Sequence, residues 1–152
     1  MKSHAQAVVI GGGVIGCSIL YHLTKLGWTD VVMLERDELT SGSTWHAAAN
    51  IHGLHDSTNI SRIQHYTMNL YKELEQETGQ GCGVFQPGSL YLAQTEAREH
   101  QLRLQEAKAK LYGMNFHEVS RDEAERLHPL VNYDGIRCIM FEPDGGNVDP
   151  SG

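Results

Sequence analysis

The first 35 residues contain the pattern that most restricts how this chain can fold. A short β-branched run over residues 7–10 leads into three consecutive glycines, and an apolar helical pattern then covers residues 14–26. A second β-branched run occupies residues 31–34. Because strand, tight turn, helix and strand follow in this order, we expect an α/β fold that starts with a Rossmann-like βαβ unit. Its strands should be parallel and its crossover right-handed.

The glycines of the first turn have the spacing of a dinucleotide-binding loop. Gly11, Gly13 and Gly16 form G-x-G-x-x-G between the predicted strand and the predicted helix. The first glycine permits a sharp turn, the second lets the backbone approach a pyrophosphate, and the third lets helix and strand pack closely. The N–H groups at the start of the helix, including those of Val14 and Ile15, and the positive end of the helix dipole would hold the diphosphate.

Glu35 follows the second predicted strand, about 20 residues beyond the glycines, where a carboxylate can accept hydrogen bonds from ribose hydroxyls. Its charge also disfavours a 2′-phosphate, so FAD or NAD is preferred over NADP, although the neighbouring Arg36 weakens this exclusion. The alternative is a glycine-rich turn in an unrelated α/β fold with a solvated Glu35. We favour the dinucleotide hypothesis because all the elements fall at the expected places.

After the βαβ unit the regular alternation of strand and helix is lost. Residues 39–59 lack a period and are expected to form a long loop. A helix is expected from Ile60 to Gly79, with Tyr66, Tyr71 and Leu74 on its buried stripe. The later elements are expected to be a strand over 88–93, a helix capped by Thr95 that reaches Tyr112, a short helix capped by Ser120 and Glu123, a strand over 136–141 and a turn over 143–146.

We therefore divide the chain into two regions. Residues 1–80 are expected to form the N-terminal dinucleotide-binding βαβ unit together with the loop that follows it. Residues 81–152 are expected to start a second α+β region, which would be a substrate or cap region. Asp149 and Pro150 are typical of the approach to another helix, so we expect the chain to end within an incomplete fold.

Composition and charge exclude several classes of partner. The 12 Lys and Arg residues against 19 Asp and Glu residues give a net charge of −7, which repels nucleic acid and anionic lipid. No apolar run has the roughly 20 residues of a membrane helix, so neither nucleic acid nor membrane is expected as a partner. Three distant cysteines and nine scattered histidines show no metal-ligand spacing, so no metal site is expected. The absence of a signal or transit peptide favours a bacterial cytoplasm, or the mitochondrial matrix if a transit peptide has been removed.

The segment over residues 39–48 combines groups that suit a phosphate or a flavin. It offers small residues for close approach, hydroxyls and backbone amides for oxygen atoms, and one imidazole beside an indole. These groups belong to Gly42, Ser43, Thr44, Trp45 and His46. On these residues alone, a histidine such as His46 is more often a surface-loop residue than a catalytic group.

With this segment included, the chain resembles the dimethylglycine and sarcosine dehydrogenase family, within the D-amino-acid-oxidase-like flavoproteins. The resemblance covers essentially the whole chain, and the stretch Ser43-Thr44-Trp45-His46 is its most specific part. The other shared segments are the glycine-rich turn, Glu35-Arg36, residues 75–79, 86–90 and 128–130, Asp144-Gly145 and Asp149-Pro150. The family pattern often continues with Gly and Leu where this chain has Ala49 and Asn50.

The resemblance implies an FAD-dependent dehydrogenase or oxidase. It implies that a ring nitrogen of His46 is bonded to the 8α-methyl carbon of the flavin, which would raise the reduction potential of the flavin. The implied substrate is a small N-methylated amine or amino acid that loses a hydride to the flavin, after which its methyl carbon is released as formaldehyde or trapped by tetrahydrofolate. The implied electron acceptor is an electron-transfer flavoprotein or oxygen. No catalytic residue is assigned within this chain.

Two other functions fit parts of the sequence. An NAD-dependent dehydrogenase would use the glycine turn and Glu35 but would have no use for His46. A non-catalytic dinucleotide-binding module would keep the fold without the chemistry. A bound yellow chromophore would exclude the first alternative, and a redox titration of that chromophore would test the second.

Overall fold

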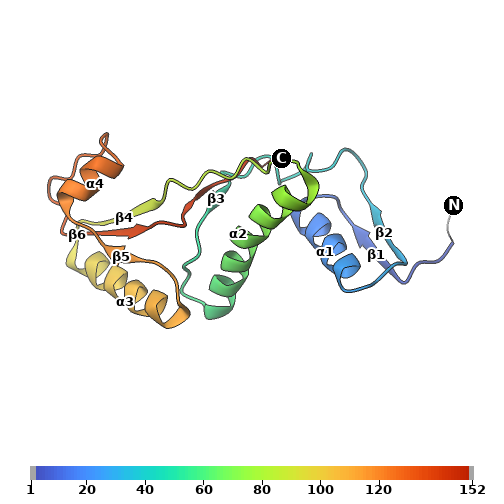
Figure 1. Cartoon of the computed structure of the whole chain (residues 1–152), viewed down its shortest axis with the longest axis horizontal. Coiled ribbons are helices and arrows are strands. Elements are labelled where there is room, and N and C mark those ends of the chain that lie inside the picture. Colours follow the sequence, from blue (N-terminus) through green and yellow to red (C-terminus); the bar gives the residue numbers. More distant parts are fainter. Residues whose placement is uncertain (1–2, 151–152) are drawn as a thin grey trace. The chain divides into compact units, whose positions relative to one another are not determined.

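The computed structural model describes residues 3–150 of the chain (Figure 1). The backbone packs into two compact units, of which the first ends at Ala49 and the second extends from Asn50 to Pro150. The structural boundary therefore lies well before residue 81, where the βα alternation led us to place it. The end of that alternation marks a change of pattern, but it does not show which elements pack together. The assignment of functional regions to residues 1–80 and 81–152 stays a prediction.

The first unit contains the βαβ arrangement that the sequence predicts. Strand β1 (Ala7–Ile10) pairs in parallel with β2 (Val31–Leu34), and helix α1 (Val14–Lys25) packs on both strands (Figure 1). The register places Ala7 opposite Val31 and Ile10 opposite Leu34. The carboxyl ends of both strands therefore lie at the same edge of this two-stranded sheet, where the glycine turn begins.

The second unit contains three helices and five strands, and the strands form two small antiparallel sheets. Strand β4 lies beside β6, which also pairs with β5, and the two-residue strands β3 and β7 pair with each other. The elements in chain order are β3 (Asn50–Ile51), α2 (Thr58–Thr78), β4 (Ser89–Ala93), α3 (Glu96–Tyr112), β5 (His117–Glu118), α4 (Arg121–Leu127), β6 (Cys138–Glu142) and β7 (Gly146–Asn147). The mixed α/β architecture is confirmed. Strands β3, β5 and β7 were missed because two residues are too few to show a period.

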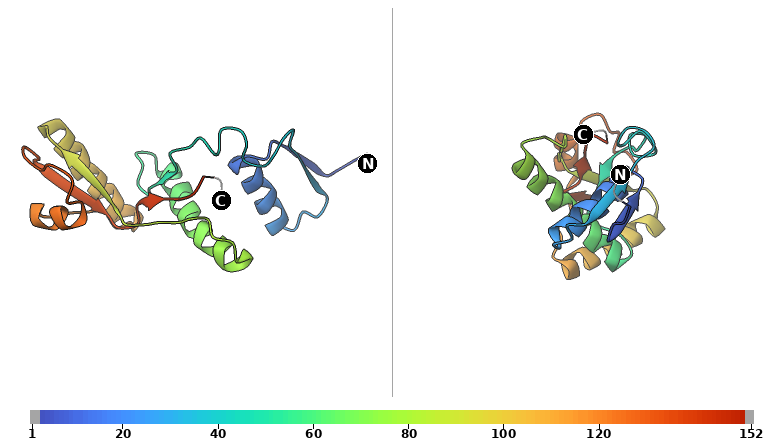
Figure 2. Two further views of the ribbon diagram at one scale, coloured as in Figure 1. Left: turned by 90° about the horizontal axis from the view of Figure 1, so that it is seen from above. Right: turned by 90° about the vertical axis from the view of Figure 1, so that its right-hand side faces the viewer.

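Strand β6 divides the core of the second unit between its two faces. Successive residues of a strand point to opposite faces, and accordingly Cys138 and Met140 pack in one buried cluster with Leu102 and Ala109 of α3. Ile139 belongs to a second cluster, which contains Ala124 of α4. The helix α3 runs alongside β4 and β6 (Figure 2).

One carboxylate is buried in this unit and its bonds join three segments. Glu142 accepts hydrogen bonds from the Gly53 N–H at 2.6 Å and from the Tyr91 hydroxyl at 2.6 Å. Burial raises the pKa of Tyr91, and the hydrogen bond to Glu142 raises it further. The carboxylate therefore holds the segment after β3 against β4 and β6, and its own oxygens are satisfied as burial requires.

The helix ends follow local sequence signals, whereas the buried face of α2 does not. Thr95 Oγ1 accepts from the Arg98 N–H at 3.3 Å and Ser120 Oγ accepts from the Glu123 N–H at 3.2 Å, which confirms both predicted caps. Gly79 ends α2 with φ of 71°.

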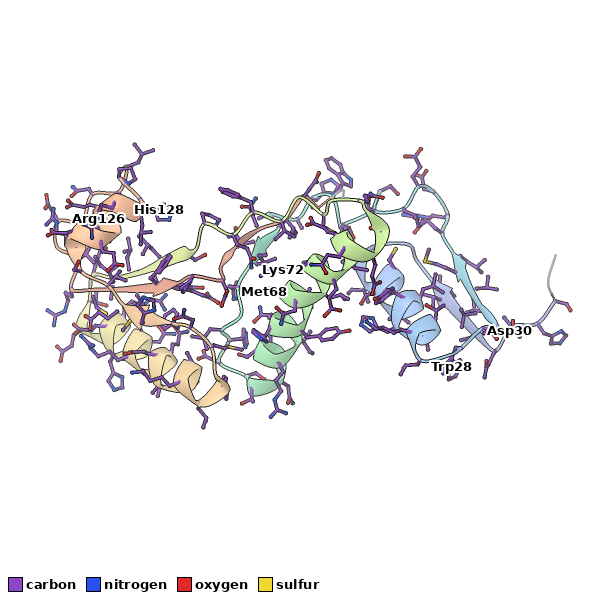
Figure 3. The ribbon with its side chains drawn as sticks, in the orientation of Figure 1. Trp28, Asp30, Met68, Lys72, Arg126 and His128 are labelled. Carbon is purple, nitrogen blue, oxygen red and sulfur yellow. The ribbon has the colours of Figure 1, made fainter. Side chains whose placement is uncertain are left out.

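The predicted stripe on α2 is wrong in part. Tyr66 is 45% exposed, and the buried positions of the helix are Ser61, Met68 and Leu70; Met68 is labelled in Figure 3. The spacing of apolar residues along the chain identifies the apolar face of a helix, but only the packing of neighbouring elements decides which part of that face is buried. The helix predicted to follow Pro150 lies outside the described residues.

Candidate dinucleotide site

The glycine turn joins the ends of the two parallel strands. Gly11 has φ of +103°, a conformation that side chains rarely adopt, and its N–H donates to the carbonyl of Leu34 at 2.8 Å. At Gly16 a Cβ atom would overlap the carbonyl oxygen of Gly11 and would lie 3.5 Å from Val9 Cγ1. The third glycine therefore allows α1 to start directly against the end of β1.

Gly12, the middle residue of the run Gly11-Gly12-Gly13, also has little space for a side chain, which sequence reasoning missed. A Cβ at Gly12 would meet Leu39 Cδ2 and would lie 3.2 Å from Glu35 Cβ. The G-x-G-x-x-G pattern allows any residue at this position, yet here the side chains of Leu39 and Glu35 occupy the space beside it. The run of three glycines was the only signal in the sequence that could have shown this.

The start of α1 presents backbone N–H groups, and the first turn of this helix contains no acidic residue. The first hydrogen bond within the helix runs from the Cys17 N–H to the Gly13 carbonyl at 3.0 Å, so by helix geometry the N–H groups of Ile15 and Gly16 have no carbonyl partner within the helix. The N–H of Val14 donates to Thr44 Oγ1 at 3.0 Å. The N–H groups of Ile15 and Gly16, together with the helix dipole, therefore suit an anion such as a diphosphate, whereas the N–H of Val14 is already bonded to the loop.

Glu35 is held on the glycine turn by backbone hydrogen bonds. Its Oε2 accepts from the Gly12 N–H at 2.5 Å, and its Oε1 accepts from the N–H groups of Arg36 at 2.7 Å and Asp37 at 3.1 Å. The bond from Gly12 is the largest cause of a lowered pKa of the Glu35 carboxyl, followed by the bonds from Asp37 and Arg36. A carboxylate has about four acceptor positions, so roughly one remains for a ribose hydroxyl. The side chain of Arg36 is exposed.

We expect the charge of Glu35 to stabilise the turn in a pH-dependent way. Because the pKa of the folded state lies below the ordinary value, the stabilisation is present above that value and is lost as the pH falls through the lowered pKa. Glu35→Gln should therefore lower the free energy of unfolding at neutral pH, and the difference from the wild type should shrink as the pH falls below the ordinary carboxyl pKa and through the lowered one.

The measurement is denaturant unfolding of the full-length wild type and variant across this pH range. Glu38→Gln, which removes an exposed charge three residues further along, controls for the change in net charge. A Glu35→Gln difference that stays constant with pH would show that the carboxylate charge does not stabilise the turn.

Two hydrogen bonds connect the loop over residues 39–48 to the glycine turn. The Thr40 N–H donates to the Gly12 carbonyl at 3.0 Å, and Thr44 Oγ1 accepts from Val14 as described above. Thr40 has φ of 64°, which is unusual for a β-branched residue. Such strain persists only where surrounding contacts maintain it, and it is frequent at functional sites.

The same loop holds its two rings on neighbouring carbonyl groups. His46 Nδ1 lies 3.0 Å from the Gly42 carbonyl oxygen, and Trp45 Nε1 donates to the Ser41 carbonyl at 3.0 Å. A carbonyl oxygen can only accept, so Nδ1 must carry the proton in this hydrogen bond. In the neutral imidazole the lone pair is then on Nε2. Both rings are exposed, and so is Ser43 in the same turn.

The structure thus brings together most of the residues expected to bind the cofactor. The glycines Gly11, Gly13 and Gly16, the helix start at Val14 and Ile15, Glu35 and Thr44 meet around one turn. Gly42, Ser43, Trp45 and His46 lie in the loop that is tied to this turn. Sequence reasoning missed Gly12 and Thr40, which make the connecting hydrogen bonds.

Among residues 3–150, no three His, Cys, Asp or Glu side chains gather as ligands for a metal ion. The helices described here also include none with the length and apolar content that crossing a membrane requires.

The fold and the site define the class of βαβ proteins that bind dinucleotides, and comparison with known proteins narrows that class. The chain matches the family described as FAD dependent oxidoreductase over residues 6–152, and it belongs to that family. It is 40% identical over 149 residues to the mitochondrial dimethylglycine dehydrogenase of Rattus norvegicus, covering 98% of this chain and 17% of that protein. It is 39% identical over 153 residues to the mitochondrial sarcosine dehydrogenase of Homo sapiens, covering 100% of this chain and 17% of that protein.

A solved structure shares the same fold. The crystal structure of L-proline dehydrogenase from P. horikoshii matches with a TM-score of 0.89 and 24% identity, covering 99% of this chain and 40% of that one. The predicted resemblance to dimethylglycine and sarcosine dehydrogenases is therefore confirmed, and so is the fold. The chain spans only 17% of the length of these two dehydrogenases.

Proposed function

We propose that this chain binds the ADP half of FAD in a protein that oxidises a small N-methylated amine or amino acid. The observation that carries the proposal is the arrangement at the start of α1. There the Glu35 carboxylate and the loop over residues 39–48 are joined by hydrogen bonds to one glycine turn, next to N–H groups that have no carbonyl partner within the helix. Membership of the FAD dependent oxidoreductase family supports FAD rather than NAD. Bound FAD would supply the hydride-accepting chemistry.

The residues of the turn fit the ADP half of this cofactor. The diphosphate would lie at the start of α1, where Gly13 leaves the backbone accessible. The remaining acceptor position of Glu35 would receive a ribose hydroxyl, and the carboxylate would disfavour a 2′-phosphate. The similarity to dehydrogenases of dimethylglycine and sarcosine supports an N-methylated amino acid as substrate.

We further propose that His46 carries the flavin covalently. With Nδ1 donating to Gly42, Nε2 is the nitrogen available to bond the 8α-methyl carbon. A C–N bond replaces one C–H bond, and two protons and two electrons are released. The protons come from the methyl carbon and from the imidazole and pass to solvent, and the electrons pass to the acceptor, which would be dioxygen or an electron-transfer flavoprotein.

His46→Ala is expected to abolish covalent attachment while leaving noncovalent FAD binding largely intact, because the glycine turn and Glu35 are unchanged. The measurement is acid precipitation of the full-length protein followed by peptide mass spectrometry. In the wild type the yellow colour should stay in the pellet, with a flavin adduct on the peptide that contains His46. In His46→Ala it should pass into the supernatant.

His100→Ala, which removes an exposed histidine of α3, is the matched control and should keep the adduct. Flavin released entirely from the wild type, with the His46 peptide unmodified, would contradict covalent attachment. A protein that binds no yellow chromophore at all would favour an NAD-dependent dehydrogenase. A bound flavin that could not be reduced would indicate a non-catalytic binding module.

Three features of the proposal rest on the resemblance to relatives. They are the electron acceptor, a role for tetrahydrofolate, and location in the mitochondrial matrix or the bacterial cytoplasm, and all three stay predictions. The two dehydrogenases described above are mitochondrial by name. Cell fractionation and reduction assays with each acceptor would test these features directly.

A further inference from the structure

The rings of Trp45 and His46 lie close together and are tilted against each other, although the two residues are neighbours in the chain. Their ring centroids lie 3.8 Å apart with an angle of 37° between the planes. Adjacent residues in a helical turn do not normally face each other, because their side chains leave the turn in different directions. The close approach therefore requires both side chains to turn towards the same side of the loop.

Two hydrogen bonds turn the rings in this way. Trp45 Nε1 reaches back four residues to the Ser41 carbonyl, and His46 Nδ1 reaches back four residues to the Gly42 carbonyl. The indole is therefore anchored independently of the imidazole beside it. Both of its interactions are made within the loop.

The hydrogen bond of His46 alone does not orient the imidazole completely. It holds Nδ1, but the ring could still tilt about the line from Nδ1 to the Gly42 oxygen. The indole lies against the imidazole, with 3.8 Å between the ring centroids, and restricts that tilt. With Nδ1 held and the indole on one side, the range of directions open to Nε2 is narrow.

The ring pair is also fixed relative to the helix that would receive the diphosphate. Thr44, the residue before Trp45, accepts the hydrogen bond from the Val14 N–H at 3.0 Å. Thr40 donates to Gly12 at the beginning of the same loop. The direction of Nε2 is thus defined with respect to the dinucleotide-binding turn.

We propose that Trp45 is a positioning residue for flavin attachment, which acts by holding the imidazole of His46 so that Nε2 faces the 8α-methyl carbon. The inference rests on the proposed covalent role of His46. It gives Trp45 a task separate from FAD affinity, since the indole acts through the neighbouring ring. Correct orientation of reacting groups has large kinetic effects, and a displacement of about 1 Å can slow a reaction about a hundredfold.

The test measures the rate of attachment at saturating FAD. Full-length protein is prepared without flavin, FAD is added, and covalent flavin is followed by its fluorescence on denaturing gels. Trp45→Leu keeps an apolar side chain but loses the ring and the bond to Ser41, and it should slow attachment about tenfold to a hundredfold. Trp45→Phe keeps an aromatic ring but lacks the bond to Ser41, and it should restore part of the rate.

A second measurement separates positioning from binding. In a His46→Ala background, where attachment cannot occur, Trp45→Leu should raise the dissociation constant of FAD by a much smaller factor than the factor by which it slows attachment in the protein that has His46. The inference is overturned if Trp45→Leu attaches flavin at the wild-type rate. It is also overturned if this variant weakens FAD binding by the same factor that it slows attachment. A wild type without any adduct would instead remove the covalent role of His46 itself, and the role of Trp45 with it.

Discussion

Gly16→Ala should destabilise the βαβ unit by about 3 kcal/mol or more, the upper range for overpacking. Alanine is normally the better residue within a helix, by about 0.5–1 kcal/mol over glycine, so helix propensity predicts the opposite sign. The tertiary geometry decides, because the new Cβ would overlap the Gly11 carbonyl oxygen. Backbone cannot move aside as a flexible side chain can. The measurement is amide hydrogen exchange of β1 and β2 in the full-length protein.

Gly81→Ala is the matched control for this substitution. A Cβ at Gly81 would lie 3.7 Å from Glu75 Oε1, an ordinary contact distance. This variant should therefore stay within about 0.5 kcal/mol of the wild type. Unchanged or increased protection of β1 and β2 in Gly16→Ala would show that the helix does not start as closely on the strand as the structure places it.

Gly13→Val should leave the protein folded but raise the dissociation constant of FAD at least about a hundredfold. This factor corresponds to about 2.7 kcal/mol of binding free energy. The backbone of Gly13 has φ of −78° and ψ of 179°, which valine adopts readily. The requirement for glycine here comes from space. A branched side chain would occupy the route by which a diphosphate approaches the backbone, and its Cβ would lie 3.0 Å from Thr44 Oγ1.

The measurement is FAD affinity by fluorescence titration in the His46→Ala background, with unfolding followed separately. Thr44→Ala is the control, because it removes the hydrogen bond to Val14 without filling the space above the turn. It should cost no more than about tenfold in affinity, or about 1.4 kcal/mol. A folded Gly13→Val variant that keeps the affinity of the control would place the diphosphate somewhere other than the start of α1.

The contrast between these glycines shows how far sequence reasoning reaches. The spacing of Gly11, Gly13 and Gly16 predicted the turn, because each position has a separate steric reason to lack a side chain. The spacing did not show that Gly12 is restricted too, although less than Gly16, because a Cβ at Gly12 would meet side chains and not backbone. That restriction comes from Leu39 and Glu35, and their approach depends on how the loop folds back over the turn.

The second unit shows the same limit. The caps at Thr95 and Ser120 were predictable because a capping side chain bonds its own helix within three residues. The exposure of Tyr66 was not, because it depends on which elements pack against α2. The boundary after Ala49 could not be predicted either, since it reflects contacts between distant segments.

The sequence by itself determined the βαβ unit and the family of this protein, because apolar period, glycine spacing and the Ser43-Thr44-Trp45-His46 stretch are all local in the chain. Only the tertiary structure decided which atoms of the site meet. The bonds from Gly12 to Glu35 and from Val14 to Thr44 join residues 23 and 30 positions apart. They depend on a loop that passes through the unusual backbone conformation of Thr40. No local preference predicts that conformation, because it costs energy by itself and is maintained by the contacts that the finished fold provides.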